Sequence, residues 1–156
     1  MRVLFMCTAN SCRSILSEAL FNHLAPPGFE AVSAGSFPRG QVLPRSLYAL
    51  QQAGIATDGL HSKGNDAFEG NPPDIVITVC DKAAGESCPV FFGPALKSHW
   101  GLVDPSEVVG DEASIDAAFR STLMTIEQRC QAFFALPFVQ LSREQLKHEL
   151  DRIGTL

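Results

Sequence analysis

The sequence predicts an α/β protein in which a four-stranded parallel sheet is flanked by helices, and two observations carry this prediction. First, the two strands expected near the N-terminus are each followed by an expected helix, and successive strand–helix units favour a parallel sheet. Second, residues 74–80 carry branched apolar side chains without alternation, as in a strand covered on both faces. At 156 residues the chain has the length of one domain, expected to span residues 1–156.

The N-terminal part of the chain contains two strand–helix units. Residues 2–6 form a short apolar run that predicts a buried strand, and residues 29–34 predict a second strand. The second helix is expected to begin at Pro44, a favourable first-turn residue, and to stop at Gly54. The first helix is expected to be amphipathic, because its apolar residues recur every three or four positions: Ile15, Leu16, Ala19, Leu20 and Leu24.

Two further strands are expected in the middle of the chain. Residues 57–73 are polar and glycine-rich, with room only for short helical turns. The strand at 74–80 follows them, and residues 97–101 predict a short fourth strand.

The C-terminal part is expected to be helical. An apolar stripe that includes Cys130 predicts a long helix from Asp111, which assigns that cysteine to the core, and Leu136-Pro137 interrupts the helix. Ser142 and Gln145 form a capping box that starts the last helix.

Composition narrows the class of protein. A net charge of −5 argues against a nucleic-acid or anionic-membrane surface. No apolar run approaches the roughly 20 residues that span a bilayer, and the N-terminus lacks the layout of a signal peptide, so we expect a cytoplasmic protein. Five cysteines in that compartment favour catalytic, redox or metal-binding roles over a static disulfide framework.

The segment from Cys7 to Ser14 carries the clearest chemical signal. It lies between an expected strand and an expected helix, so a curled loop would point backbone N–H groups inward beside the positive end of the helix dipole. The guanidinium of Arg13 fits a tetrahedral oxyanion at two points. We therefore expect an anion cup with the Cys7 thiol at its floor, lined by Thr8, Ala9, Asn10, Ser11, Cys12 and Arg13.

Positive surroundings would also make Cys7 reactive. An ordinary thiol is only a few per cent ionised at pH 7, whereas a helix N-terminus and a neighbouring cation favour the thiolate. The hydroxyl of Ser14 is placed to donate to the sulfur. The alternative is that Cys7 merely ends a buried strand, since free cysteines are among the most buried residues.

The octapeptide Cys-Thr-Ala-Asn-Ser-Cys-Arg-Ser resembles the phosphate loop of the low-molecular-weight tyrosine phosphatases and of the arsenate reductases that share their fold. This resemblance covers nearly the whole chain and implies a doubly wound sheet in the strand order 2-1-3-4. Asp104 precedes Pro105, which holds it in an extended conformation, and its position resembles that of the family's general acid. The alternative for Asp104 is a loop cap or a surface carboxylate.

Two further cysteines favour a reductase over a phosphatase. Cys80 and Cys88 are superfluous to phosphate hydrolysis, and residues 79–89 resemble the redox segment of arsenate reductases. That resemblance implies a cascade in which Cys80 attacks arsenylated Cys7 and Cys88 then forms a disulfide with Cys80. Neither a helix nor a strand of eight steps brings these two residues within disulfide distance, so the segment must loop, with Gly85 as a soft point. Hydrolysis of phosphomonoesters by a tyrosine phosphatase is the alternative.

The expected substrate is arsenate, with phosphate or sulfate as analogues, and no bound cofactor or metal is expected. The reductant would be external, either thioredoxin or glutathione with glutaredoxin, because the spacing of the two redox cysteines is one residue longer than in the thioredoxin-coupled enzymes.

Cys12 is most readily interpreted as a packed loop thiol and alternatively as a partner for Cys7. Lys63 falls where some relatives carry an acidic potassium ligand, and a cation beside Asn10 or the lysine itself would supply the charge; the alternative for Lys63 is a solvated side chain. A zinc-binding interaction module built on Cys80, Cys88 and His99 is the non-enzymatic alternative.

Overall fold

The computed structural model describes residues 1–87, 91 and 93–156. Its sheet contains four parallel strands, β1 (Arg2–Cys7), β2 (Glu30–Gly35), β3 (Ile75–Thr78) and β4 (Leu96–His99), in the order β2-β1-β3-β4. The predicted fold class and strand order are therefore confirmed. The strand expected at 74–80 is shorter than predicted, so that Cys80 lies two residues beyond its end.

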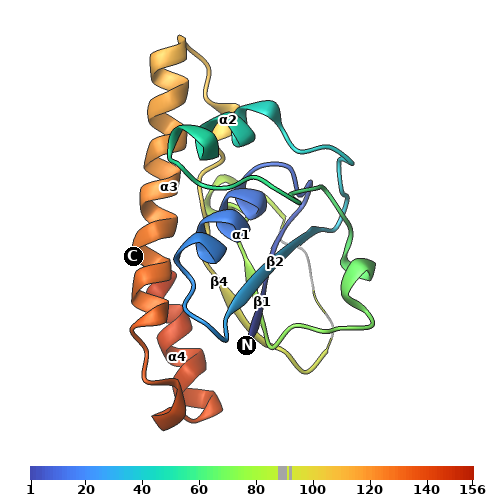
Figure 1. Ribbon diagram of the computed structural model, residues 1–156, viewed down its shortest axis with the longest axis vertical. Helices are drawn as coiled ribbons and strands as arrows, with labels where there is room; N and C mark the ends of the chain where they lie inside the picture. The colour runs from blue at the N-terminus through green and yellow to red at the C-terminus, as the bar shows by residue number, and fades with distance from the viewer. Residues whose placement is uncertain (88–90, 92) are drawn as a thin grey trace.

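The α-helices are α1 (Arg13–Leu24), α2 (Pro44–Gln52), α3 (Glu112–Phe134) and α4 (Arg143–Ile153). As predicted, α2 begins at Pro44, and Ser142 and Gln145 form the capping box of α4. Short 3₁₀ turns complete the chain: η1 (Asn65–Phe68), η2 (Lys82–Ala84), η3 (Pro105–Glu107) and η4 (Phe138–Gln140). In Figure 1, α3 runs along the molecule beside α1. Among the described residues, no helix combines the length and the apolar character needed to cross a membrane.

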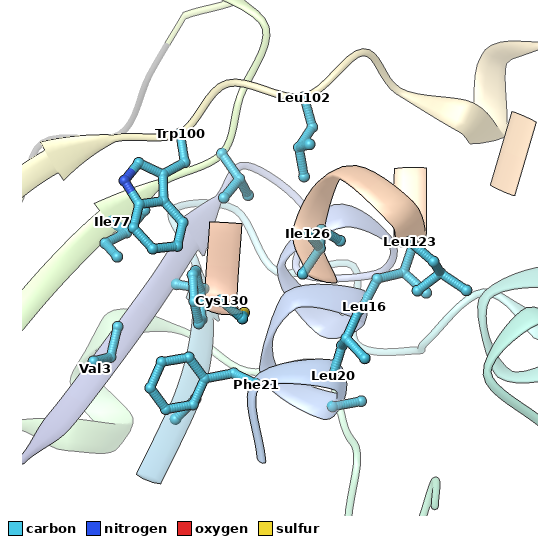
Figure 2. Close-up of a cluster of buried hydrophobic side chains, with 14 of the residues drawn as sticks. Val3, Leu16, Leu20, Phe21, Ile77, Trp100, Leu102, Leu123, Ile126 and Cys130 are labelled. Carbon is cyan, nitrogen blue, oxygen red and sulfur yellow. The ribbon is translucent and has the colours of Figure 1, made fainter. Parts of the chain in front are cut away.

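The two faces of the sheet are covered differently. On one face, side chains of β1 and β3 pack with residues of all four α-helices in a single cluster, part of which Figure 2 shows around Val3, Phe21 and Ile77. Cys130 of α3 is fully buried in this cluster, which confirms its assignment to the core. The other face buries a smaller cluster against which Phe68 of η1 and Phe91 pack: Leu4, Met6, Ala34, Val76 and Ala95.

Helix α1 is more deeply buried than its sequence predicts. Every residue from Arg13 to Phe21 is buried, polar ones included, because α1 contacts the sheet as well as α2 and α3. The polar side chains are satisfied internally, as where the Ser17 hydroxyl donates to the carbonyl of Arg13 at 2.8 Å. The amphipathic helix of the prediction is thus an almost fully enclosed helix.

The register of the sheet brings the two main thiol-bearing segments to one edge. Cys7 is the last residue of β1, and Met6 beside it is paired with Thr78 of β3. The N–H of Val79 donates to the carbonyl of Met6 at 2.9 Å, so Cys80 leaves the sheet beside Cys7. Neighbouring strands are about 4.8 Å apart, which sets the separation of the two backbones at this edge.

Candidate active site

The loop that joins β1 to α1 turns its carbonyl groups away from its centre. The carbonyls of Cys7 and Thr8 accept from the amides of Ser36 and Phe37, at 3.2 and 2.9 Å. The carbonyls of Ala9 and Ser11 are held in the same way by backbone and hydroxyl donors from Arg39, Leu43, Ser46 and Ser62. Asn10, with φ of 48°, supplies the left-handed turn that curls the loop.

With the carbonyls bonded on the outside, the amides are left for an anion. Among the described residues, the N–H groups of Ala9, Ser11 and Cys12 donate to no protein acceptor. The N–H of Asn10 donates to Cys7 Sγ at 3.2 Å, at the floor of the loop. Helix α1 begins at Arg13, so its positive dipole end adds to the same site. This is the geometry of an oxyanion site with a sulfur at its base.

Hydrogen bonds fix the Cys7 sulfur and favour its role as an acceptor. Cys7 Sγ lies 2.8 Å from Ser14 Oγ, and Asn10 Nδ2 donates to the same hydroxyl oxygen at 2.8 Å. Because the hydroxyl of Ser14 accepts from Asn10, its hydrogen is left to donate to the sulfur. Both groups are buried, which increases the strength of the contact. The predicted role of Ser14 in supporting a thiolate agrees with this arrangement.

The guanidinium of Arg13 is held by three groups. Nη1 and Nη2 donate to the two carboxylate oxygens of Glu86 at 2.7 and 2.6 Å, and Nη1 also donates to the carbonyl of Leu102 at 3.1 Å. Nη2 lies 3.5 Å from Asp104 Oδ2. Burial acts to lower the pKa of Arg13, but the hydrogen bond with Glu86 and the charges of Asp104, Glu86 and Cys7 raise it overall.

Asp104 is placed as the sequence predicts, on an extended backbone with φ of −76° and ψ of 107° before Pro105. Its Oδ1 caps η3 by accepting from the amide and hydroxyl of Ser106, at 2.9 and 2.6 Å. Its Oδ2 faces Arg13. One oxygen thus fixes the carboxyl group and the other is directed to Arg13, so the loop-cap interpretation and the general-acid interpretation are compatible.

Comparison with known proteins identifies the family. Residues 2–151 match the family described as low molecular weight phosphotyrosine protein phosphatase. The chain belongs to this family. An arsenate reductase from Bacillus subtilis is 30% identical over 131 residues, which cover 84% of this chain and 93% of that protein.

Two solved structures of arsenate reductases are similar to this chain. The arsenate reductase of Archaeoglobus fulgidus has a TM-score of 0.67 at 25% identity and covers 83% of this chain and 98% of its own. A thioredoxin-dependent arsenate reductase of Corynebacterium glutamicum has a TM-score of 0.60 at 27% identity, over 85% of this chain and 59% of that one.

The remaining cysteines differ sharply from Cys7. Cys12, in the phosphate loop of the family, is buried, and burial raises the pKa of its thiol to about 12. It therefore remains a neutral thiol at ordinary pH, in line with a packed loop residue. Cys80 is fully buried beyond β3 and is disulfide-bonded. The predicted pairing of Cys80 with Cys88, and any metal set that includes Cys88, fall outside the described residues.

Lys63 lies behind the phosphate loop. Its Nζ is 3.5 Å from Glu18 Oε1 and 3.5 Å from Ser33 Oγ, while its backbone N–H donates to Asn10 Oδ1 at 2.9 Å. Asn10 Nδ2 donates to Ser33 Oγ at 3.0 Å, and Ser33 in turn donates to Glu18. The predicted alternative of a lysine charge at this position is compatible with the geometry, because an ammonium group lies in the network that orients Asn10.

Two residues of the site were missed by the sequence analysis. A Cβ on Gly35 would lie 2.5 Å from the carbonyl oxygen of Thr8 and 3.0 Å from the amide nitrogen of Asn10, so this glycine makes room for the loop. A glycine at the end of a strand gives no signal of this close approach. Glu86 was given no role, although an acidic residue between two candidate redox cysteines was a signal that an arginine partner could be sought.

Proposed function

We propose that this protein reduces arsenate to arsenite. The observation that carries the proposal is the contact of Glu86 with Arg13, because it brings the segment between Cys80 and Cys88 onto the oxyanion loop. The names of the relatives support the same activity. An anion cup alone would serve a phosphatase equally well, whereas thiols beside the cup serve a reduction.

The first step uses the residues of the loop. The Cys7 thiolate attacks arsenate held by the loop amides and Arg13, and a bond forms between Sγ and arsenic. One arsenic–oxygen bond breaks, and the departing oxygen takes a proton from Asp104, acting in its protonated form, and leaves as water. Ser14 stabilises the thiolate before the attack through its hydrogen bond to Sγ.

The reduction uses the other two cysteines. Cys80 attacks the sulfur of Cys7, a disulfide forms between them, and the electron pair of the sulfur–arsenic bond passes to arsenic, which leaves as arsenite. Cys88 then attacks Cys80 and releases the Cys7 thiolate, which leaves a disulfide between Cys80 and Cys88. The two electrons thus come from the Cys80 and Cys88 thiols, and an external dithiol or thiol system must restore them.

Thioredoxin, or glutathione with glutaredoxin, is the proposed reductant. The name of the Corynebacterium glutamicum relative supports the first of these. A cytoplasmic location accompanies this proposal, because that compartment maintains both thiol systems in reduced form.

Phosphomonoester hydrolysis is the second candidate. It is favoured by the loop, which supplies a nucleophile and an arginine, and by Asp104 as the candidate acid beside that arginine, without need of Cys80. Ser106 and Glu107 follow Asp104-Pro105, where the tyrosine phosphatases usually carry tyrosines that bind aromatic substrates. This difference favours a small inorganic substrate over a phosphotyrosine.

The test compares arsenate turnover with thioredoxin and thioredoxin reductase against turnover with glutathione and glutaredoxin, beside hydrolysis of an aryl phosphate. We expect arsenite to accumulate with one of the two reductants and aryl phosphate to be hydrolysed slowly. Aryl phosphate hydrolysis without arsenite formation under either reductant would overturn the reductase proposal in favour of the second candidate.

A further inference from the structure

The contact between Glu86 and Arg13 uses only part of the guanidinium. An arginine side chain has five N–H donors, of which Nη1 carries two, Nη2 two and Nε one. Glu86 takes one donor from each Nη, and the carbonyl of Leu102 takes the second donor of Nη1. The second Nη2 donor and the Nε donor remain, and in a planar guanidinium these two are parallel and adjacent.

The remaining pair of donors is a complete two-point edge for an oxyanion. Nη2, which belongs to this edge, also lies 3.5 Å from Oδ2 of Asp104, the candidate acid. Among the described residues, Arg13 Nε donates to no protein acceptor. Glu86 therefore occupies the end of the guanidinium without occupying the edge that an anion would use.

Glu86 is itself fixed from the cysteine segment. Its Oε2 accepts from the amide of Asp81 at 2.8 Å, and its own amide donates to the carbonyl of Asp81 at 3.1 Å. Gly85, with φ of 82°, makes the turn that returns the chain toward Asp81. The carboxylate is thus held at the end of a compact turn that begins directly after Cys80.

We propose that Glu86 is a positioning residue, which orients Arg13 so that its free Nε–Nη2 edge faces the bound oxyanion and so links anion affinity to the conformation of residues 81–87. The proposal rests on the proposed function only in taking the loop as an oxyanion site. The alternative hypothesis is that the Glu86 carboxylate takes the place of the anion and excludes it from Arg13. The two hypotheses predict opposite changes in anion affinity when Glu86 is removed. Loss of a positioning group weakens anion binding, whereas loss of a competing carboxylate strengthens it.

The experiment is titration of the purified protein with inorganic phosphate, followed by calorimetry, for the unchanged chain and for Glu86→Ala and Glu86→Gln. We expect the phosphate Kd to rise about tenfold in Glu86→Ala, the scale of a lost charge-assisted hydrogen bond. Glutamine retains one acceptor oxygen, so the phosphate Kd of Glu86→Gln should lie between that of the unchanged chain and that of Glu86→Ala. A fall in the fraction of folded protein would reduce the number of sites and leave Kd unchanged, which separates positioning from a general structural role.

Glu107→Ala is the matched control. Glu107 is exposed and lies three residues beyond Asp104, and its replacement by alanine removes the same charge as Glu86→Ala. Its phosphate Kd should stay within about twofold of the unchanged chain. Equal or tighter phosphate binding by both Glu86 variants would overturn the positioning role while leaving the proposed function intact.

Two further outcomes separate this inference from the proposed function. A chain that binds phosphate in a Glu86-dependent way yet forms no arsenite would overturn the reductase proposal alone. An unchanged chain that binds no phosphate would overturn both proposals.

Discussion

The phosphate loop and the segment that follows Cys80 are held in place by different kinds of contact. The loop is buried except at Thr8 and Ala9, and its carbonyls are bonded to residues far away in the sequence, such as Ser36 and Leu43. In residues 81–87 the backbone bonds run within the segment, as from Gly85 to Lys82, and residues 82–85 are exposed. The comparison indicates that the loop is held by the rest of the fold, whereas residues 81–87 are held by their own backbone bonds and by the contact of Glu86 with Arg13, through which a change in this segment reaches the anion site.

The largest effect is expected for Cys7→Ser, which removes the sulfur from the phosphate loop. We expect at least a thousandfold loss of both arsenate reduction and aryl phosphate hydrolysis, because both begin with the same sulfur. Steady-state assays of both activities measure this. Cys130→Ala is the matched control, since it removes a buried thiol from the core and should retain both activities. Retention of reduction by Cys7→Ser would remove Cys7 as the nucleophile.

Cys80→Ser should separate the two activities. Without the Cys80 thiol the arsenylated Cys7 has no internal reductant, so arsenite formation under multiple turnover should fall by at least a hundredfold. Hydrolysis of an aryl phosphate should stay within about threefold, because this reaction uses the Cys7 nucleophile, Arg13 and Asp104 and does not use the Cys80 thiol. Should both activities survive at the level of the unchanged chain, the cascade through Cys80 is wrong.

Gly35→Ala tests how the phosphate loop is held by the neighbouring backbone. The new Cβ would meet the backbone of Thr8 and Asn10, so we expect a loss of about 1–3 kcal/mol in the free energy of unfolding and a weaker phosphate site. Chemical denaturation and phosphate titration measure the two effects. Gly70→Ala is the control, because a Cβ there meets nothing within 4 Å. Equal stability of the two variants would contradict the close approach at Gly35.

The smallest effect is expected for Cys12→Ala. Burial raises the pKa of this thiol to about 12, so it supplies little thiolate for attack on Cys7 at neutral pH. Arsenate reduction should change by less than about threefold, measured beside Cys80→Ser under the same reductant. A loss as large as that of Cys80→Ser would make Cys12 the partner of Cys7 and reverse the proposed order.

The sequence predicted local features well and long-range contacts poorly. The first turn of α2 at Pro44, the cap at Ser142 and the extended backbone at Asp104 follow from their immediate neighbours, and all three are confirmed. The burial of polar residues along α1 depends on contacts with the sheet, α2 and α3, and the contact of Glu86 with Arg13 joins residues 73 positions apart in the chain. Such contacts are set by the tertiary arrangement, which neither periodicity nor spacing encodes.

The outward carbonyls of the phosphate loop carry a consequence for protein engineering. Their donors come from residues 36–46 and from Ser62, so the curvature of the octapeptide is imposed by its surroundings. Grafting these eight residues onto a foreign strand–helix junction would transfer the thiol and the guanidinium but not the external scaffold. A transplant that keeps the curvature of the octapeptide would also need residues 36–46 and Ser62.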